Sequence, residues 1–489
     1  MPKSSVKNVL VILCDQLRKD CLGCYGNAYI RTPHIDSLAR RGVRFTRNYV
    51  ANPICMPNRL SLLSGMFPAN HGLWTNGLLV KDEGATLMHH LAAAGCQTAS
   101  IGKIHFEPTD CAADAGSCES FDRWRTKPDM EGFHGPFWGF EYVELQDGHG
   151  SVEQHMRPWF VERGGRDDML VPDANGVHEL PNHLNSSAFV GERTVNYLRG
   201  VRDADRPFFL VASFPDPHAP FIAGRESVAG RSGDDVVMPV GSPEDLAERP
   251  AHYRQHLDGA WHRSGARQPA HPGGIPEALC RKRIALTYAM IEQIDVNVGA
   301  ILGALEEQGL ADDTAVIFTS DHGELLGDHG LWHKGPFFYE GLINTPLIVA
   351  MPGHARGAVI SDALVSAVDL APTICDALGV SAPFYVDGIS QLPVIDGASA
   401  QLRHSCLLEY RNGYSEKDCC TKALITRTHK YIRYQTGERE LTDLQNDPVE
   451  TYNVSGQPAY ADVEAQLADG LLTLLLQTQS KKPIQISLA

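Results

Sequence analysis

The stretch NVLVIL at residues 8–13 decides the fold of this chain. It is almost continuously apolar, which is typical of a strand buried on both faces of a parallel sheet. It ends abruptly before two polar residues, Asp15 and Gln16. Similar short strands alternate with helical patterns further along, so the sequence predicts an α/β fold in which helices sandwich a large, mostly parallel sheet. The predicted strands lie at residues 98–101, 208–212 and 315–318, and the predicted helices at residues 32–40, 86–94, 187–198 and 284–305.

The chain divides into two predicted domains and carries two long insertions. From about residue 400 the pattern changes to short strand-like pieces followed by one helix, which favours a smaller antiparallel α+β domain. We therefore expect a large α/β domain over residues 1–395 and a C-terminal domain over residues 396–489. Residues 107–185 and 222–282 are rich in Gly, Asp and His and show little periodicity. Both are predicted to be insertion loops, which usually shape a binding site.

The composition excludes several classes of protein. The chain has 489 residues, 43% of them hydrophobic, and a formal net charge of −16, values typical of a soluble globular enzyme. Its acidic balance disfavours a nucleic-acid partner, which requires a basic surface. The sequence shows neither an apolar run of about 18 residues nor the apolar core of a signal peptide, so we expect no membrane span and a cytoplasmic location. The 12 cysteines are then expected to be reduced thiols.

Polar residues follow four of the predicted strands at the point where each strand ends. In an open parallel sheet, functional groups collect beyond the carboxyl ends of the strands. Any one of these residues alone would be a helix cap or a structural hydrogen-bond partner, but their convergence indicates a metal ion and an anionic substrate. The residues are Asp15, Lys103, His105, Asp216, His218, Asp321 and His322.

Residues 52–65 carry the most specific motif. Pro57 and the apolar spacing after it predict a helix that starts at Cys55 and stops at Gly65. Backbone N–H groups and the helix dipole at its start favour negative charge, including an anionic group bound nearby. A buried or merely acidic thiol at a helix cap is the plain alternative. The pattern C-x-P-x-R, completed by Arg59, favours a chemical role for the cysteine.

Three motifs together resemble the type I, formylglycine-dependent sulfatases of the alkaline-phosphatase superfamily. They are C-x-P-x-R at residues 55–59, Gly-Lys-Ile-His at residues 102–105 and Ser-Asp-His-Gly-Glu at residues 320–324. Shorter matches in the same order extend the resemblance over nearly the whole chain. The resemblance implies an alkaline-phosphatase-like catalytic domain and an enzyme that hydrolyses a sulfate monoester to an alcohol or phenol and inorganic sulfate.

The resemblance implies that Cys55 is oxidised after synthesis to formylglycine (3-oxoalanine) by a formylglycine-generating maturation enzyme that acts on the Cys55 motif. The hydrated aldehyde is a geminal diol, one oxygen of which ligates the metal and attacks the sulfur of the ester. The covalent sulfate hemiacetal then collapses when the second hydroxyl loses its proton. A sulfated thiol or serine would have to be hydrolysed by water that attacks a charged intermediate. The diol needs no such attack, because its second hydroxyl can expel the sulfate and restore the aldehyde.

The implied metal ligands are Asp15, Asp321, His322 and the diol at Cys55. Many sulfatases carry two acidic residues at the first position, whereas residue 14 here is Cys and only Asp15 can ligate. His322 stands where many relatives have Asn. Calcium prefers oxygen ligands, while imidazole suits manganese and other transition ions. We expect one divalent metal, with Ca²⁺ first and Mn²⁺ or Mg²⁺ as alternatives.

The resemblance also implies roles for the remaining residues. Arg59 would hold the formylglycine and offset charge on the sulfate, and His105 would take the proton of the diol. Cations and hydrogen-bond donors placed where charge develops are what such a transfer requires. The groups that would bind the substrate, or protonate its leaving oxygen, are Asn76, Lys103, His218 and Lys334.

Two other functions are possible: a hydrolase of phosphonate or phosphate esters, and a non-catalytic binding protein. Phosphonate monoester and phosphodiester hydrolases of the same superfamily share the cysteine motif but lack the Lys and His found here at residues 103 and 105, which favours a sulfate ester. A non-catalytic binding protein would lack site residues, and every main position is filled. The expected partner is a small-molecule sulfate ester. The sequence leaves open whether this is a carbohydrate, choline-type or aryl sulfate, and whether the chain forms a homo-oligomer.

Overall fold

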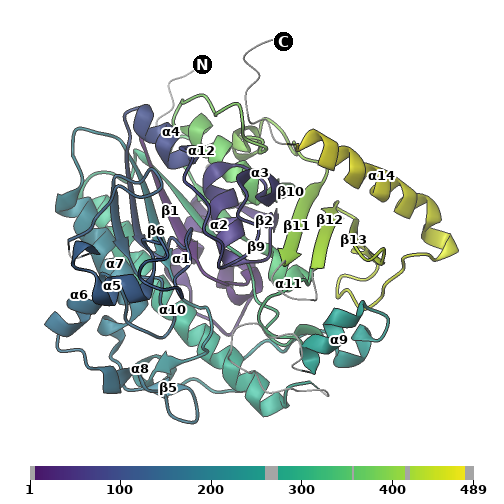
Figure 1. The fold of residues 1–489 in the computed structure, drawn as a ribbon, viewed down its shortest axis with the longest axis horizontal. Helices are drawn as coiled ribbons and strands as arrows, with labels where there is room; N and C mark the ends of the chain where they lie inside the picture. Colours follow the sequence, from purple (N-terminus) through teal and green to yellow (C-terminus); the bar gives the residue numbers. More distant parts are fainter. Residues whose placement is uncertain (1–5, 131, 259–273, 355–356, 413–418, 480–489) are drawn as a thin grey trace.

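The computed structural model describes residues 6–130, 132–258, 274–354, 357–412 and 419–479. At its centre the described residues form an eight-stranded sheet in which every strand except β9 runs in the same direction (Figure 1). This arrangement confirms the predicted α/β class. In spatial order the strands are β10 (Val359–Ser366), β2 (Val43–Tyr49), β9 (Asn344–Ala350), β8 (Thr314–Ser320), β1 (Asn8–Cys14), β6 (Phe208–Phe214), β3 (Gln97–Gly102) and β4 (Tyr142–Leu145).

Helices cover both faces of this sheet, which explains the apolar run in β1. Val9, Val11 and Leu13 belong to one core, and Leu10 and Ile12 belong to the core on the opposite face. Alternate residues of a strand point to opposite faces, so a strand buried on both sides needs apolar residues throughout. The first core includes α2 (Cys55–Ser64), α4 (Leu87–Ala93) and α12 (Leu370–Ala377), and the second includes α1 (Pro33–Arg41), α7 (Ser186–Asn196) and α10 (Glu277–Glu307).

A smaller antiparallel sheet, at the right of Figure 1, is formed by the C-terminal part of the chain. On one face Leu424 shares a core with Leu467 of α14 (Ala461–Gln477), and the other face packs against residues 337–343. This is the α+β unit that the sequence predicts, while the domain boundary at residue 396 stays a prediction. In order along the sheet the strands are β11 (Cys406–Asn412), β12 (Cys419–Ile425), β13 (His429–Tyr434) and β14 (Arg439–Asp443).

The two segments predicted as insertion loops contain regular structure. Residues 107–185 include β4, a strand of the central sheet that the sequence pattern did not predict, because four residues are too few to show a periodicity. The strands β5 (Val177–His178) and β7 (Ala223–Gly224) pair in parallel, so the two segments meet. The helix expected at residues 284–305 already begins at Glu277. The other helices of these segments are α5 (Phe121–Thr126), α6 (Met156–Glu162), α8 (Arg225–Val228) and α9 (Ala251–Leu257), and residues 259–273 lie outside the described residues.

Three further helices are short: α3 (Pro68–His71), α11 (Glu340–Ile343) and α13 (Leu392–Ile395). None of the helices in the described ranges combines the length and the apolar character needed to cross a bilayer.

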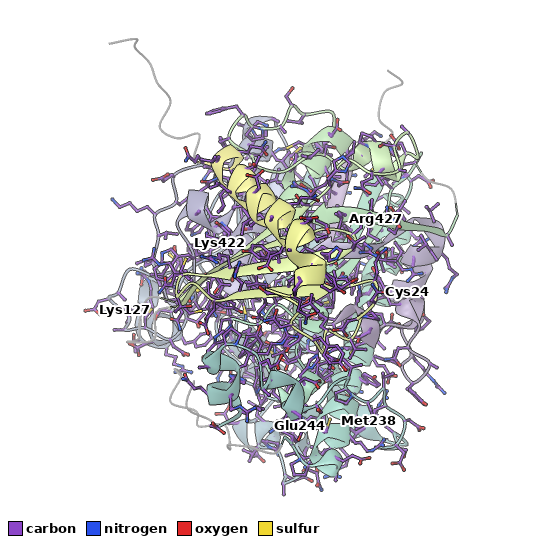
Figure 2. The ribbon with its side chains drawn as sticks, turned by 90° about the vertical axis from the view of Figure 1, so that its right-hand side faces the viewer. Cys24, Lys127, Met238, Glu244, Lys422 and Arg427 are labelled. Carbon is purple, nitrogen blue, oxygen red and sulfur yellow. The ribbon has the colours of Figure 1, made fainter. Side chains whose placement is uncertain are left out.

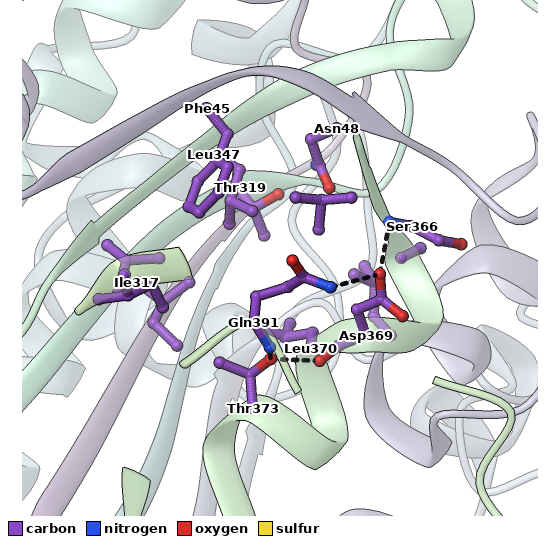
Figure 3. Close-up of a pocket in the computed structure, with 15 residues that line it drawn as sticks. Phe45, Asn48, Ile317, Thr319, Leu347, Ser366, Asp369, Leu370, Thr373 and Gln391 are labelled. Carbon is purple, nitrogen blue, oxygen red and sulfur yellow. Dashed lines mark hydrogen bonds between the residues drawn. The ribbon is translucent and has the colours of Figure 1, made fainter. Parts of the chain in front are cut away.

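An interior cavity of about 380 Å³ lies on the α12 side of the central sheet (Figure 3). Its walls are mostly apolar and include Phe45 and Leu347. The carboxylate of Asp369 accepts the N–H of Ser366 at 2.9 Å and pairs with Arg403, so its charge is compensated. None of the predicted site residues lines this cavity, and we assign it to packing rather than to chemistry.

Candidate active site

The carboxyl ends of four adjacent strands bring the predicted strand-end residues together. Asp15 follows β1, Lys103 follows β3, His218 lies beyond β6, and Asp321 follows β8. These strands are parallel neighbours in the order β8-β1-β6-β3, so their carboxyl ends meet at one edge of the sheet. Lys103 Nζ lies 2.5 Å from Asp15 Oδ2 across that edge.

Cys55 is the first residue of α2, as the sequence predicts, and only 1% of its surface is exposed. All ten residues of the helix are buried. Its first turn is capped by a side chain, because the N–H of Met56 donates to Asn76 Oδ1 at 3.0 Å. At the other end Gly65 has a φ of +73°, and its N–H donates to the carbonyl of Ser61 at 2.9 Å. A left-handed glycine of this kind is a common helix stop.

The thiol of Cys55 is surrounded by cationic and metal-binding groups. Lys334 Nζ lies 2.7 Å from its Sγ, His322 Nε2 lies 3.1 Å away, and Asp15 Oδ1 lies 3.6 Å away. Burial and Asp15 oppose ionisation of the thiol. Lys334, His322 and Lys103 outweigh both and hold the pKa of Cys55 below its ordinary value. The position therefore favours an anionic nucleophile over an inert buried thiol.

Arg59 lies one turn after Cys55 and is completely buried. Its Nε donates to Asp321 Oδ2 at 2.6 Å, and its Nη1 donates to the carbonyl of Lys103 at 2.7 Å and to Ser213 Oγ at 3.0 Å. Nη2 lies 3.7 Å from Asp15 Oδ2. Burial opposes the charge of the guanidinium, but Asp321 and Asp15 overcome it and hold the pKa of Arg59 above its usual value. Arg59 thus connects the two aspartates to α2.

Four of the predicted residues form a donor set that fits a divalent cation. Asp15, Cys55, Asp321 and His322 are all buried, and one ligand atom from each lies within 4.8 Å of the others. His322 Nδ1 lies 2.7 Å from the carbonyl of Gly323, which favours a proton on Nδ1, so that Nε2, beside Cys55 Sγ, is the nitrogen that could ligate a metal. Two carboxylates and one neutral imidazole suit Ca²⁺, Mn²⁺ or Mg²⁺.

His149 is a site residue that the sequence analysis did not predict. Its Nε2 lies 2.6 Å from Lys103 Nζ and 3.4 Å from Asp15 Oδ2, and its ring stacks on His218 at 3.8 Å. Burial, reinforced by neighbouring groups, lowers the pKa of both imidazoles well below its ordinary value. Asp15, His149 and His218 also lie close enough to share a metal ion. Lys103 Nζ already places a positive charge against His149 and Asp15, which disfavours a second metal ion there.

Buried polar groups hold Lys334 in place. Its Nζ donates to Gln16 Oε1 at 2.9 Å and lies 2.8 Å from His218 Nε2. The side-chain amide of Gln16 in turn donates to Glu324, which also accepts the N–H of Leu326 at 3.1 Å. The sequence analysis assigned no role to Gln16 or Glu324. Their positions were nevertheless a signal, because Gln16 directly follows the predicted ligand Asp15 and Glu324 is the last residue of the motif at residues 320–324.

Two predicted residues lie apart from these contacts. The backbone N–H of His105 donates to Glu119 Oε1, and its ring Nδ1 is buried without a hydrogen-bond partner among the described residues. Within the same residues no hydrogen bond or ion pair joins its ring to Cys55. Asn76 contributes its carbonyl oxygen to the cap of α2. Proton transfer by His105 and substrate binding by Asn76 stay predictions.

A buried cysteine at a helix start, a donor set that could hold a divalent metal and three cationic side chains meet at one edge of a mostly parallel sheet, as expected for a hydrolase of the alkaline-phosphatase superfamily. Sequence comparison agrees with that class. The family model described as Sulfatase matches residues 7–380, and one described as N-sulphoglucosamine sulphohydrolase, C-terminal, matches residues 327–477. The chain therefore belongs to the sulfatase family.

Similar proteins include both sulfatases and hydrolases of other esters. An arylsulfatase of Clostridium perfringens is 28% identical over 93% of this chain and 91% of its own length. The multifunctional alkaline phosphatase superfamily protein PehA of Trinickia caryophylli is 30% identical over 96% of this chain and 95% of its own. The crystal structure of the phosphonate monoester hydrolase of Agrobacterium radiobacter superposes with a TM-score of 0.83 at 26% identity, covering 99% of this chain and 98% of that one.

Proposed function

We propose that this protein hydrolyses a sulfate monoester to an alcohol or phenol and inorganic sulfate. The observation that carries the proposal is the cationic lining around residue 55. Lys334 Nζ lies 2.7 Å from Cys55 Sγ, and Lys103 and Arg59 reach the same pocket from the side of Asp15. Fixed cations of this kind stabilise the negative charge that develops on the oxygens of a transferring sulfate group.

Each group has a separate proposed task. Formylglycine made from Cys55 would supply the nucleophilic hydroxyl, and a divalent metal held by Asp15, Asp321 and His322 would activate that hydroxyl. Lys334 and His218, whose nitrogens lie 2.8 Å apart, bind the sulfate and deliver a proton to the leaving oxygen.

His105 is proposed to accept a proton from residue 55, and its buried Nδ1, which has no hydrogen-bond partner among the residues that the structure describes, supports that role. Arg59 orients residue 55 by fixing α2 against Asp321. The oxidation of Cys55 requires a maturation enzyme that acts on the motif at residues 55–59.

The second candidate is a phosphonate monoester or phosphodiester hydrolase, favoured by the structural similarity to such an enzyme. Comparing 4-nitrophenyl sulfate with a 4-nitrophenyl phosphonate monoester distinguishes the two. We expect kcat/KM to be higher for the sulfate by at least about tenfold. We also expect Lys103→Met to lower the sulfate rate more than the phosphonate rate, because Lys103 is the cation that distinguishes the two sequence patterns.

The matched control is Lys127→Met, which removes an exposed lysine labelled in Figure 2. It is expected to leave both rates unchanged. A phosphonate rate far above the sulfate rate would establish the second candidate instead.

Removal of the metal is expected to inactivate the enzyme and to destabilise it. Without a bound metal, the buried carboxylates of Asp15 and Asp321 lose one of the positive charges that compensate them, although Lys103 and Arg59 still pair with them. EDTA should lower turnover by more than about 100-fold, since the metal activates the nucleophile. It should also lower the melting temperature, because a ligand at about 1,000 times its Kd adds about 4 kcal/mol of stability.

Titrating Ca²⁺, Mn²⁺ and Mg²⁺ back separately identifies the preferred ion by the lowest concentration that restores both properties. In Asp321→Asn the chelator should no longer change the melting temperature. An enzyme indifferent to EDTA in both measurements would contradict the proposed ligands.

A further inference from the structure

A second cavity, of about 610 Å³, lies beside the proposed active site. One wall is the β5–β7 pair, through His178 and Ala223, and another is the middle of α10, through Gln293. The cavity therefore lies where the segments of residues 107–185 and 222–282 meet.

His218 belongs both to this cavity and to the cationic cluster around Cys55. Its Nε2 lies 2.8 Å from Lys334 Nζ, and the same residue lines the cavity. For a sulfate bound by Lys334 and Lys103, the proposed proton donor His218 would be the group that adjoins both the ester oxygen and the cavity. We therefore place the alcohol part of the ester in this cavity, an assignment that rests on the proposed hydrolysis of a sulfate ester.

The cavity and the cationic cluster differ in charge. Among the described residues, no lysine or arginine lines the cavity, and Asp216 is the one carboxylate. The hydroxyls of Ser186 and Ser187 donate to Asp216 Oδ2 at 2.9 and 2.6 Å, whereas no hydrogen bond from a described residue reaches Oδ1. Burial lowers the pKa of His178, so its imidazole adds no positive charge at neutral pH. Within the described lining, the polar groups are thus one carboxylate, amides, hydroxyls and imidazoles, and most of the other residues are apolar, among them Met156 and Ile222.

These groups suit an alcohol that carries several hydroxyls and no charge. Asp216, the amides of Asn185 and Gln293, and the hydroxyl of Ser151 all bond to hydroxyl groups. An acidic group on the alcohol would lie near Asp216 without a compensating cation, which is unfavourable. A quaternary ammonium would lack its usual aromatic surroundings, because no Trp, Tyr or Phe among the described residues lines the cavity.

We propose that this cavity binds an uncharged polyhydroxy alcohol, such as a neutral sugar unit, and that Asp216 makes the site reject acidic sugars. The proposal selects one of the substrate classes that the sequence leaves open. It also gives Asp216 a role in specificity that is separate from the chemistry at Cys55.

Matched sugar sulfates test this assignment. The substrates are the monosulfates of methyl glucoside and methyl glucuronide at the ring hydroxyls that both sugars carry, so that the members of each pair differ only by a hydroxymethyl group or a carboxylate. We expect kcat/KM for the best glucoside isomer to exceed that for the matching glucuronide by more than about tenfold. Asp216→Asn should narrow this ratio to within about threefold. The control Glu244→Gln, which removes an exposed carboxylate labelled in Figure 2, should leave the ratio unchanged.

Equal turnover of the two sugars by the wild-type enzyme would overturn the proposal. So would an unchanged ratio in Asp216→Asn at an unchanged melting temperature. If that variant does not fold, Gln293→Lys replaces it: a cation on the α10 wall of the cavity should raise the glucuronide rate relative to the glucoside rate.

The proposed function is tested separately with 4-nitrophenyl sulfate. If no sulfate ester is hydrolysed, the proposed function is wrong. The preference for a neutral sugar is then measured with phenylphosphonate monoesters of the same two sugars.

Discussion

Cys55→Ala is expected to abolish turnover of sulfate esters while the protein keeps its fold. The substitution removes only the sulfur atom from the first turn of α2, and the cap from Asn76 to the Met56 N–H does not involve it. Loss of a nucleophile typically costs more than about 10⁴-fold in kcat. The void left by one sulfur atom costs about 1 kcal/mol of stability. The measurements are kcat/KM with 4-nitrophenyl sulfate and the melting temperature.

A matched control removes a different thiol by the same substitution. Cys24 is half-buried, is labelled in Figure 2, and pairs with no group of the active site, so Cys24→Ala should keep wild-type turnover. A peptide mass spectrum of wild-type enzyme produced with its maturation enzyme should show an aldehyde at residue 55, that is, loss of the sulfur and two hydrogens of Cys55 and gain of one oxygen. Turnover by Cys55→Ala above a few per cent of wild type would end the proposed mechanism.

Arg59→Met is expected to lower stability by about 3–5 kcal/mol as well as to remove activity. Arg59 is completely buried between two buried carboxylates, and it makes three hydrogen bonds, to Asp321, Lys103 and Ser213. Methionine fills a similar volume but leaves Asp321 without its charged partner. The midpoint of thermal or urea unfolding measures this loss. Arg59→Lys keeps the positive charge but cannot make hydrogen bonds to Asp321, Lys103 and Ser213 at the same time. Its loss of stability is therefore expected to lie between zero and that of Arg59→Met.

Arg427→Met is the corresponding surface control. Its guanidinium pairs with Asp362, its side chain is 42% exposed, and Figure 2 labels it on the outside of the molecule. Exposed ion pairs contribute about 0–1 kcal/mol, so this variant should unfold close to wild type. An Arg59→Met protein as stable as Arg427→Met would show that the buried aspartates do not depend on Arg59.

Much of the fold could be predicted because the central strands are buried on both faces. β1, β6 and β8 are fully buried, so each appears in the sequence as an apolar run. β10 was not predicted, since half of it is exposed, and β2 alternates apolar with polar residues. Local pattern alone did not separate these strands from loops.

Site residues that directly follow strands could be predicted from the sequence, whereas a site residue in a loop could not. Asp15, Lys103 and Asp321 directly follow strands, so the strand order alone brings them together. His149 lies in a loop after the short strand β4, and the path of a loop is not set by a local periodicity. Among the described residues no hydrogen bond joins the ring of His105 to Cys55, since a residue's position in a sequence motif does not determine where its side chain points.

The complete burial of α2 affects when Cys55 can be modified during the life of the chain. With all ten helix residues packed inside and the thiol 1% exposed, another protein cannot bring its own active site to that sulfur once the domain has formed. For the proposed conversion to formylglycine, the maturation enzyme has to meet the segment while it is still unfolded, during or soon after its synthesis. Chains that fold before they are modified would then stay unmodified and inactive. The yield of active enzyme would therefore depend on the rate of modification relative to the rate of folding.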